Sequence, residues 1–570
     1  MRLSRLVISN FRNLEAIDIS LASGAVIVGE NRSGKSNLLH AIRLVLDPSL
    51  SSFQRTLTNE DFAEGLGHDP MGDGAVIEVT IELADFEDDE GLVATLNSAL
   101  ISGEPMRASL TYRFGPRDDQ GEQDPPAYEW AIYGGGDTSR RVGGELRTYL
   151  HHVHMHALRD VEGDIGSWRR SPLRPLLEDV SRRTSADDLT AVAQALEHAN
   201  DAVRSLDSVQ QAAKDIERQT EALVGQLHRL EPTLDLALAD PERSLRALRM
   251  YIDGAAQRSL GRASLGALNV LYIALLQIEL SRRLAKGEIE HALISIEEPE
   301  AHLHPHLQRR MFSGLLASDD DKRSTIVSTH SPHIVSVTPP RQLVVLRDVE
   351  GATKAFAAQE AQLRDRAWDD LGRYLDATRS ELVFARRVLL VEGFAEQVLL
   401  PRIAAPEIDF DEYGVTVCPI HGTHFGSYVA FLRAIGTPYA VITDGDPDAG
   451  KGKTGAERAA AVAKALGEEG TDPEQLGVFY GDTTFEVDLF DVSHENDAAM
   501  VKALKSLRPG PKTKKRLTEA HDAGDLTGET FLAFIDGFTT KGRFAQRLAS
   551  SCESLDPPAY VDRALGHLLS

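Results

Sequence analysis

The sequence predicts an α/β protein with two separate sheet-containing units. Short apolar segments alternate with helical segments on both sides of a charged stretch at about 350–380. This alternation is typical of parallel sheets that are covered by helices. A long Ala/Leu/Glu/Arg-rich segment at 172–250 has helical periodicity and few breakers, which predicts a helical insertion in the first unit. The insertion is either a helical layer of that domain or a dimerisation arm.

Each element follows from its local pattern. The first unit is predicted to hold a strand at 2–9, an apolar strand at 24–28, a helix at 36–46, antiparallel strands at 75–84 and 108–113, an apolar helix at 265–285, and buried parallel strands at 292–296, 324–328 and 342–346. The second is predicted to hold strands at 387–391, 414–418, 439–443 and 476–480. We therefore expect domains at 1–365 and 380–570, with loops at 449–455 and 505–516.

Composition limits the class of protein. The chain has 570 residues, of which 42% are apolar and 26% charged, as in soluble proteins with several cores. It has no run of eighteen apolar residues, so we expect no membrane span. Only Cys418 and Cys552 occur, so we expect a reducing, cytoplasmic setting without a disulfide framework. The net charge of −26 disfavours a protein that coats nucleic acid but permits a local basic groove.

A phosphate-binding loop follows the strand at 24–28. Residues 29–36 match G-x-x-x-x-G-K-S, with a helix directly after them. The two glycines permit a tight turn that points N–H groups at phosphates, the lysine would reach the β- and γ-phosphates, and the serine would ligate Mg²⁺. The loop therefore predicts binding of ATP with Mg²⁺ through Gly29, Asn31, Gly34, Lys35, Ser36 and Asn37.

Two carboxylates end a later apolar strand. Glu297 and Glu298 follow the strand at 292–296, where the first would hold Mg²⁺ and the second would orient or deprotonate the attacking water. His330 follows the next strand and is placed to sense a γ-phosphate. The alternative is a strand end with solvated carboxylates. A zinc site of nearby histidines matches no standard spacing; it would use His291, His302, His304 and His306.

A second set of carboxylates follows the strands of the second unit. The sequence has E-G-x-x-E after one strand, D-G-D after another and E-x-D after a third. The carboxyl ends of parallel strands meet at one edge of a sheet, and oxygen ligands of this kind select Mg²⁺ or Mn²⁺. Two such ions support phosphodiester cleavage. The alternative is a scatter of surface acids. The predicted ligands are Glu392, Glu396, Asp444, Asp446, Glu486 and Asp488.

The first unit resembles the ABC-type ATPases of the SMC/RecF group, and most closely the OLD (overcoming lysogenization defect) family. The resemblance rests on IEEPEAHLHP at 296–305 and STHSP at 328–332. It implies that Ser264 and Gly266, in SLGALN, form a signature motif that contacts ATP bound to the opposite subunit. It also implies a homodimer or tetramer formed through the ATPase and helical region.

The second unit resembles a Toprim domain, and an ATPase followed by a Toprim domain is the arrangement of OLD nucleases, including those of Gabija antiphage systems (GajA-like). The resemblance implies an ATP-regulated, metal-dependent DNA endonuclease or nickase that acts in antiphage defence or DNA repair. It implies a catalytic role for Glu392, and it places Lys541 near the scissile phosphate. It also raises a helicase as a partner protein.

The basic segment at 505–516 is the best DNA-backbone candidate in this acidic chain, although a solvated loop is an equal alternative. The rival function is a non-nucleolytic ATPase clamp for DNA repair, in which the Toprim fold serves interaction only. Topoisomerase or primase chemistry ranks lower, because no local motif identifies a tyrosine nucleophile.

Overall fold

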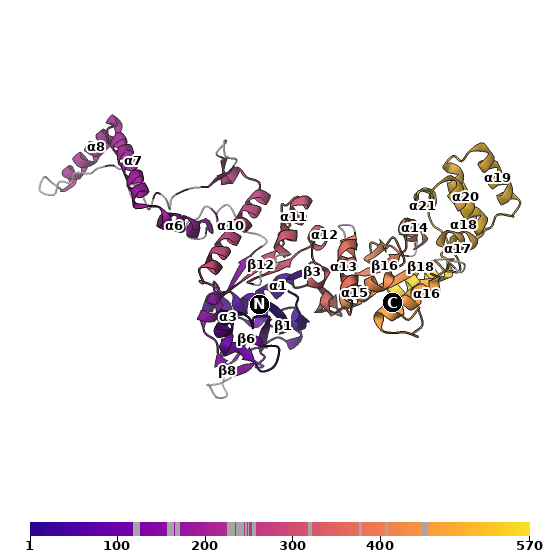
Figure 1. Ribbon diagram of the computed structural model, residues 1–570, viewed down its shortest axis with the longest axis horizontal. Helices are drawn as coiled ribbons and strands as arrows, with labels where there is room; N and C mark the ends of the chain where they lie inside the picture. The colour runs from indigo at the N-terminus through magenta and orange to yellow at the C-terminus, as the bar shows by residue number, and fades with distance from the viewer. Residues whose placement is uncertain are drawn as a thin grey trace. The chain divides into compact units, whose positions relative to one another are not determined.

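The structure is a computed structural model of the 570-residue chain, traced in Figure 1. It describes residues 1–117, 126–156, 165, 171–224, 234, 244, 248, 250–252, 258–316, 322–375, 379–404, 408–446 and 453–570. Internal contacts divide the chain into two compact units. The larger unit comprises Met1–Ala157, Ile289–Glu300 and His304–Ser570, and the smaller comprises Leu158–Glu288 with Ala301–Leu303.

The larger unit begins with an antiparallel sheet. Its strands follow the order β2-β1-β4-β6-β7-β8, with β5 (Leu100–Ile101) paired to β6. Leu6 and Ile8 of the first strand are fully buried while alternate positions are more exposed, as expected for a sheet with one face in the core. The main strands are β1 (Arg2–Phe11), β2 (Leu14–Ser20), β4 (Ile77–Ala84), β6 (Arg107–Pro116), β7 (Tyr128–Gly134) and β8 (Asp137–Arg141).

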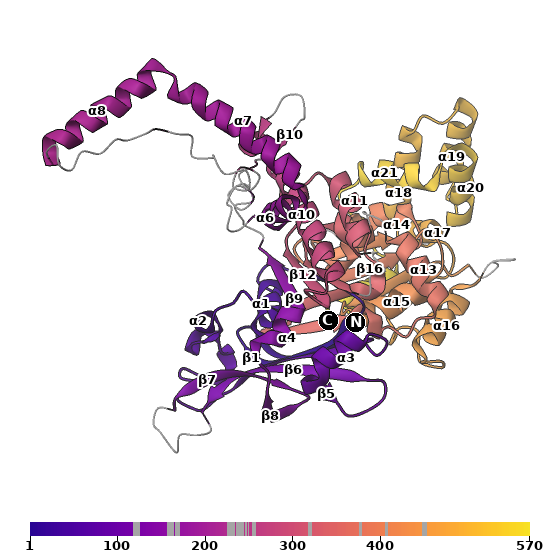
Figure 2. The same cartoon turned by 60° about the vertical axis from the view of Figure 1, so that its left-hand side comes forward.

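A second sheet of the larger unit is mainly parallel, in the order β15-β14-β3-β13-β12-β9. Helix α1 (Lys35–Leu46) contacts strands of both sheets (Figure 2). Because neighbouring parallel strands end at the same edge, the segments after β3, β13 and β12 come together. The strands are β3 (Ala25–Gly29), β9 (Leu150–Met155), β12 (His291–Glu297), β13 (Arg323–Ser328), β14 (Leu343–Val349) and the antiparallel edge strand β15 (Ala352–Ala357).

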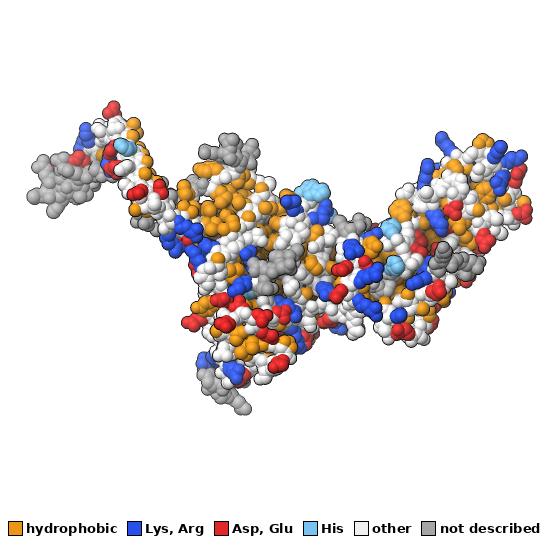
Figure 3. Space-filling view, in the orientation of Figure 1, with side chains coloured by type: hydrophobic (Ala, Val, Ile, Leu, Met, Phe, Trp, Pro, Cys, Tyr) orange, Lys and Arg blue, Asp and Glu red, His pale blue; other side chains and the backbone are white. Residues whose placement is uncertain are grey.

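The smaller unit is helical. It contains α6 (Leu173–Arg183), α7 (Ala186–Arg204), α8 (Asp207–Val224) and α10 (Leu265–Ala285). The predicted helical insertion is therefore confirmed over 173–224, and most of 225–250 lies outside the described residues. Among the described helices, α10 alone is long and apolar enough to cross a membrane by length and composition, a property that core helices of soluble proteins share. Figure 3 shows hydrophobic side chains gathered over it.

The C-terminal part of the larger unit holds a four-stranded parallel sheet, in the order β17-β16-β18-β19. Its strands are β16 (Arg387–Val391), β17 (Val415–Pro419), β18 (Tyr439–Thr443) and β19 (Val478–Tyr480). Its main helices are α14 (Phe394–Ala404), α15 (Phe425–Ala434), α16 (Gly455–Leu466) and α22 (Ala559–Leu569). A group of further helices packs into the same core; they are α17 (Phe485–Asp491), α18 (His494–Ser506), α19 (Pro511–Asp522), α20 (Gly528–Phe538) and α21 (Lys541–Ala549).

One local expectation is wrong, and other elements were not predicted. The segment 505–516 is not a loop throughout, because α19 begins at Pro511, where a proline suits the first helical turn. The charged stretch at 350–380 contains β15 and α13 (Asp365–Tyr374), since β15 pairs with β14 and so belongs to the first parallel sheet. Strand β9 was not predicted, because its sequence LHHVHM is poor in the β-branched and aromatic residues that favour strands.

Candidate functional site

The phosphate loop has the backbone that its sequence requires. Gly34 adopts a φ of 90° just before α1, and a Cβ atom there would lie 2.6 Å from Nδ2 of Asn13, so only glycine fits. The ammonium group of Lys35 donates hydrogen bonds to the carbonyl oxygens of Gly29 (3.1 Å) and Glu30 (2.9 Å). A buried lysine that donates to loop carbonyls is ready to exchange them for phosphate oxygens.

The chemistry of the loop fits ATP. Burial lowers the pKa of Lys35, and Glu298 and Glu300 oppose that shift. The hydroxyl of Ser33 is buried without a hydrogen-bond partner among the described residues, so it is open to a ligand atom. Asn31 and Ser36 are exposed.

One predicted ATP contact is already engaged. The amide of Asn37 accepts a hydrogen bond from Nη1 of Arg12 at 2.9 Å and donates one to Oδ1 of Asn13 at 2.7 Å. Arg12 is itself paired with Asp61 at 2.9 Å. Asn37 therefore braces the strand β1 region against α1, and its contact with nucleotide stays a prediction.

The carboxylates after β12 lie beside the histidine after β13. Nε2 of His330 is 3.8 Å from Oε1 of Glu298, which has a φ of 41°. Burial, followed by the charge of Lys35, lowers the pKa of His330. The structure thus brings together Lys35, Glu298 and His330, as predicted for hydrolysis of a γ-phosphate.

Two further features of this edge were not predicted. Glu300 accepts hydrogen bonds from the backbone N–H of His330 (2.6 Å) and from the hydroxyl of Thr329 (2.8 Å), and burial raises the pKa of its carboxyl. It fixes the turn that carries His330. Glu297, the predicted Mg²⁺ ligand, faces His154 and His156 of the β9 segment.

The signature residues lie at the start of α10, in the smaller unit. Ser264 is exposed and caps the helix by accepting a hydrogen bond from the backbone N–H of Ala267 at 3.2 Å. Gly266 is buried, and a Cβ atom there would lie 2.4 Å from the carbonyl oxygen of His302. Their contact with ATP of a second subunit stays a prediction.

The second candidate site lies at the carboxyl edge of β16 and β18, which pair directly. Glu392 follows β16, and its Oε1 accepts hydrogen bonds from the backbone N–H of Asp444 (2.9 Å) and from the hydroxyl of Thr443. Oδ1 of Asp444 accepts one from the backbone N–H of Phe485 at 2.9 Å, which joins β18 to the start of α17. The first two predicted carboxylate sets therefore converge.

A tight backbone approach explains the glycine of the D-G-D segment. A Cβ atom on Gly445 would lie 2.2 Å from the carbonyl oxygen of Gly481, in the turn after β19. Any larger residue would push Asp444 and Asp446 away from the neighbouring strand end. The sequence motif thus has a direct steric cause.

Buried carboxylates crowd this site. Glu396 on α14 and Glu486 on α17 are both buried. Burial, together with the charges of Glu486 and Glu392, raises the pKa of Glu396 to about 7. Burial, then Glu392 and Glu396, raises the pKa of Asp444 to about 8. Like charges in one buried site favour protonation or a counter-cation.

Two basic side chains supply part of that counter-charge. Nζ of Lys541, the first residue of α21, lies 2.7 Å from Oε2 of Glu486. Burial opposes the charged amine, but Glu486, Asp444 and Glu396 outweigh it and raise the pKa of Lys541. Lys541 therefore lies beside these carboxylates, and its catalytic role stays a prediction.

Arg458 on α16 is the residue that sequence reasoning missed. It is buried, and its guanidinium lies 2.6 Å from Oε1 of Glu392 and 2.6 Å from Oδ2 of Asp446. It also donates to the hydroxyl of Thr443 (3.0 Å) and the carbonyl of Asp444 (3.0 Å). An arginine inside a helix carries no local signal of such a role, because only the tertiary fold brings it to the strand ends.

Asp488 does not join these contacts. Its Oδ1 accepts hydrogen bonds from the backbone N–H (3.0 Å) and the hydroxyl (2.6 Å) of Thr483, so it braces the turn between β19 and α17. Burial raises the pKa of its carboxyl. Its prediction as a metal ligand finds no support in this arrangement.

The donor set fits hard divalent cations. It consists of carboxylate oxygens, which Mg²⁺ and Mn²⁺ prefer, and a cation would offset the burial and mutual repulsion that raise the pKa values of Glu396 and Asp444. The buried Nε of Arg458 and the hydroxyls of Thr484 and Tyr560 have no hydrogen-bond partner among the described residues. Such atoms can serve water around an ion.

These two sites define the class of protein: an ATPase joined to a Toprim domain. The AAA ATPase domain model matches residues 1–97 and 178–335, and the model of the Toprim domain of overcoming lysogenization defect-like proteins matches 383–446. The chain belongs to the OLD family and is an enzyme with an ATPase and a Toprim nuclease region.

Named relatives agree with this membership. The chain is 28% identical to an OLD nuclease of Thermus scotoductus, over 78% of this chain and 82% of the relative. It is 23% identical to the endonuclease GajA of Bacillus cereus, over 80% of this chain and 77% of the relative. The solved C-terminal region of the Xanthomonas campestris OLD protein is 31% identical, covers 33% of this chain and 95% of that one, and gives a TM-score of 0.28.

Proposed function

We propose that this chain is an ATP-regulated, metal-dependent DNA endonuclease or nickase whose cleavage site is the Toprim carboxylate cluster. The observation that carries the proposal is the convergence of Glu392, Glu396, Asp444 and Glu486 with Lys541 at one strand edge. Two Mg²⁺ or Mn²⁺ ions bound there would supply an activated water and a clamp on the leaving oxygen.

The protein groups have separable tasks in this proposal. Glu392 and Asp444 hold metal from adjacent strand ends, with Glu396, Asp446 and Glu486 completing the set. Lys541 is a compact cation that stabilises charge on the scissile phosphate. A carboxyl group such as Glu396, with a pKa of about 7, can accept or release a proton near neutral pH.

Contacts between the ATPase and Toprim regions support regulation by ATP. Glu30 belongs to the phosphate loop and pairs with Arg386, the residue just before β16, at 2.6 Å. Arg347 of β14 donates hydrogen bonds to the carbonyl oxygens of Ala385 (3.0 Å) and Ile435 (3.1 Å). A change in the phosphate loop on nucleotide binding therefore has a short route to the strand that ends at Glu392.

A basic surface on α19 and the end of α18 supports contact with DNA. Figure 3 shows Lys and Arg side chains gathered on α19. Phosphate contacts rest on such side chains, and this surface accommodates them within an acidic chain. The surface comprises Lys505, Arg508, Lys512, Lys514, Lys515 and Arg516.

The assembly is proposed as a homodimer or tetramer. Leu265 and Ile278 of α10 are exposed large hydrophobic side chains, and Ser264 is exposed at the start of the same helix. A second subunit that covers this face would also receive the signature motif. We further propose antiphage defence or DNA repair as the role, a cytoplasmic location and a helicase as a candidate partner protein.

The test is cleavage of defined DNA by the full chain with Mg²⁺ or Mn²⁺, with and without ATP. We expect strand scission that Glu392→Gln abolishes, and a dependence on ATP that Lys35→Ala abolishes. Scission that is unaffected by Glu392→Gln would place the cleavage site elsewhere. Scission with equal rates at every ATP concentration would remove regulation from the proposal.

A second candidate is an ATPase clamp that binds DNA without cutting it. One observation favours it: Arg458 already bridges Glu392 and Asp446, so two predicted metal ligands are paired with protein. This candidate predicts ATP hydrolysis that DNA stimulates, and no scission with Mg²⁺, Mn²⁺ or Co²⁺. The same assay therefore separates the two functions.

A further inference from the structure

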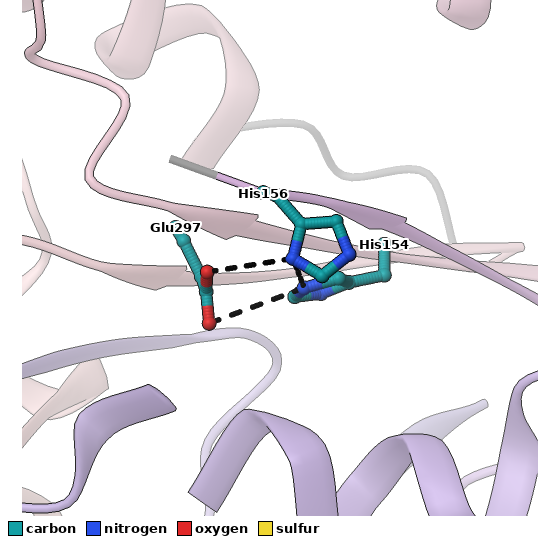
Figure 4. A group of neighbouring side chains, drawn as sticks. All are labelled: His154, His156 and Glu297. Carbon is teal, nitrogen blue, oxygen red and sulfur yellow. Dashed lines mark hydrogen bonds and ion pairs between the residues drawn. The ribbon is translucent and has the colours of Figure 1, made fainter. Parts of the chain in front are cut away.

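The strand β9 places three histidines on one face. His152, His154 and His156 alternate along an extended segment, so their side chains point the same way. The strand lies beside β12 in parallel register, with His154 paired to Ser295. Glu297 ends β12, and so its carboxylate reaches the last two histidines (Figure 4).

The distances suit one small cation. Nε2 of His154 lies 3.2 Å from Nδ1 of His156. Oε1 of Glu297 lies 4.0 Å from Nε2 of His154, and its Oε2 lies 3.7 Å from Nδ1 of His156. Bonds of about 2.0–2.1 Å in a tetrahedron place ligand atoms about 3.3 Å apart. Among the described parts of the chain, this is the only group of three His, Cys, Asp or Glu ligand atoms within 4.8 Å of one another.

Hydrogen-bond contacts behind the site already orient the buried side chain of His154. Nδ1 of His154 lies 2.8 Å from the hydroxyl of Ser295, which also lies 2.8 Å from Nε2 of His152. A proton on Nδ1 of His154 satisfies the serine and leaves a lone pair on Nε2, directed at Glu297 and His156. Histidines that bind metal are usually held in this way by their other nitrogen.

Access and chemistry agree with the geometry. The side chain of His156 is 56% exposed, whereas those of His154 and Glu297 are 3% and 13% exposed. Nδ1 of His154 is engaged with the hydroxyl of Ser295, which leaves Nε2 for a ligand. An ion can therefore enter past His156 and meet a ready acceptor.

We propose that His154, His156 and Glu297 form a binding site for a transition-metal divalent cation, with Zn²⁺ as the representative ion. Two imidazoles and one carboxylate suit Zn²⁺, Co²⁺ or Mn²⁺, whereas Mg²⁺ prefers oxygen ligands. Three protein ligands leave a fourth position for water. The site is distinct from the all-oxygen cluster of the Toprim domain.

The site shares Glu297 with the ATPase. A bound Zn²⁺ ion engages this carboxylate and withdraws it from the Mg²⁺ that accompanies ATP. Zinc is therefore an inhibitor of ATP hydrolysis here, and this consequence, unlike metal binding itself, rests on the proposed function.

The binding test uses the full chain, stripped of metal and titrated with Co²⁺ or Zn²⁺ in excess Mg²⁺, which fills the oxygen sites. We expect one imidazole-bound Co²⁺ per chain, seen by visible d–d absorption. His156→Ala, at an exposed position, should weaken it by more than about 100-fold, and Ser295→Ala by about 10–100-fold, the usual effect of an outer partner.

The matched control is His304→Ala. His304 and His306 form a second His-x-His pair, are exposed and have ring centroids 5.3 Å apart, but they do not belong to the group with Glu297. This variant should bind like the wild type. Equal spectra and affinities for wild type and His156→Ala, or an equal loss in His304→Ala, overturn the proposal.

A second readout separates this site from the proposed function. The ratio of ATP hydrolysis without and with Zn²⁺ should be large for the wild type and close to one for His156→Ala. If the chain binds Co²⁺ at these histidines but hydrolyses no ATP, the ATPase assignment is wrong and the metal site is still supported. Inhibition of equal size in both proteins would sink the inhibitory role of the site.

Discussion

The ATPase site and the Toprim site each lie at the carboxyl edge of a parallel sheet, here called the ATPase edge and the Toprim edge. The two edges share this arrangement of strands but differ in their balance of charge. In both, parallel strands deliver carboxylates to one edge of a sheet. In the ATPase, Glu298 interacts with both a lysine and a histidine, and Lys35 donates its hydrogen bonds, among the described residues, to loop carbonyls alone. In the Toprim domain, carboxylates outnumber the cations, and two of them have pKa values raised to about 7 and 8.

The difference indicates what each edge lacks. The ATPase edge presents a buried cation and backbone donors, so it needs an anion, which is the phosphate chain of a nucleotide. The Toprim edge presents unbalanced oxygen acceptors, so it needs cations. Arg458 and Lys541 supply part of that charge from within the chain, and metal ions would supply the rest.

The largest expected effect comes from removing a strand-end ligand of the Toprim edge. Glu392→Gln should reduce DNA cleavage by more than about 100-fold, since loss of an outer partner of a metal ligand alone commonly costs 10–100-fold. Rates with Mn²⁺ on supercoiled DNA provide the measurement. Asp482→Asn, at an exposed carboxylate in the β19–α17 turn, serves as the control and should cleave normally. If Glu392→Gln keeps more than about a tenth of the activity, Glu392 is not an essential ligand of the Toprim edge.

The next effect concerns the cation that faces these carboxylates. Lys541→Met should lower kcat by about 100-fold, a usual loss for one group that stabilises developing charge, with little change in KM. It also leaves the buried Glu486 without its ion pair. Lys464→Met, at an exposed lysine of α16, is the matched control. A change in KM alone would make Lys541 a DNA-binding residue.

A third prediction uses the pH dependence of the metal-free protein. The folded pKa values of Glu396 and Asp444, about 7 and 8, exceed the values near 4 of unfolded carboxyl groups. Between these values the folded chain binds more protons, so this stabilisation is complete below about pH 4 and is lost as the pH rises through 8. The Tm of the metal-free protein should therefore fall as the pH rises from 5 to 8.

Asp444→Asn is the variant that tests this assignment. It removes one titrating group, so its Tm should depend less steeply on pH than that of the wild type. Addition of Mn²⁺ at pH 8 should raise the Tm of the wild type, because the ion binds only the folded state. Its affinity should rise by up to about tenfold per pH unit for each proton displaced. Identical pH profiles for the two proteins would assign the titration to other groups.

The main loop and strand-end residues of both edges could be predicted from the sequence, because local patterns specify them. Gly34 and Lys35 follow from loop and helix chemistry, and Glu392 and Asp444 follow from their positions after apolar strands. Arg458 could not be predicted, because it reaches the carboxylates only through the way in which its helix, α16, packs in the tertiary fold. The alternation of His154 and His156 was a visible signal that was missed, because β9 itself was not recognised as a strand.

Asp488 shows the converse limit. Its spacing after Glu486 suggested a shared role, but α17 points the two carboxylates to different partners, Lys541 for one and Thr483 for the other. Residues two apart on a helix do not face the same way. Because this segment is helical, the two carboxylates of E-x-D point in different directions.

The smallest effect concerns the link between the two edges. Glu30 and Arg386 are 50% and 62% exposed, so their ion pair should contribute no more than about 1 kcal/mol to stability. The ion pair is useful as a probe of the coupling between ATP binding and DNA cleavage, because Glu30 belongs to the phosphate loop and Arg386 precedes β16. We expect Arg386→Ala to leave cleavage without ATP nearly unchanged and to shrink the ratio of the cleavage rates with and without ATP.

A double-mutant cycle decides whether the pair itself carries that coupling. Glu30→Gln, Arg386→Ala and the double variant should change the ATP ratio by the same factor, since either single change already breaks the pair. Arg433→Ala breaks a comparably exposed pair with Glu468 that involves no phosphate-loop residue, and it should leave the ratio intact. Additive effects in the cycle would mean that the two residues act independently, and the nucleotide signal would then have to pass through Arg347 and its carbonyl acceptors instead.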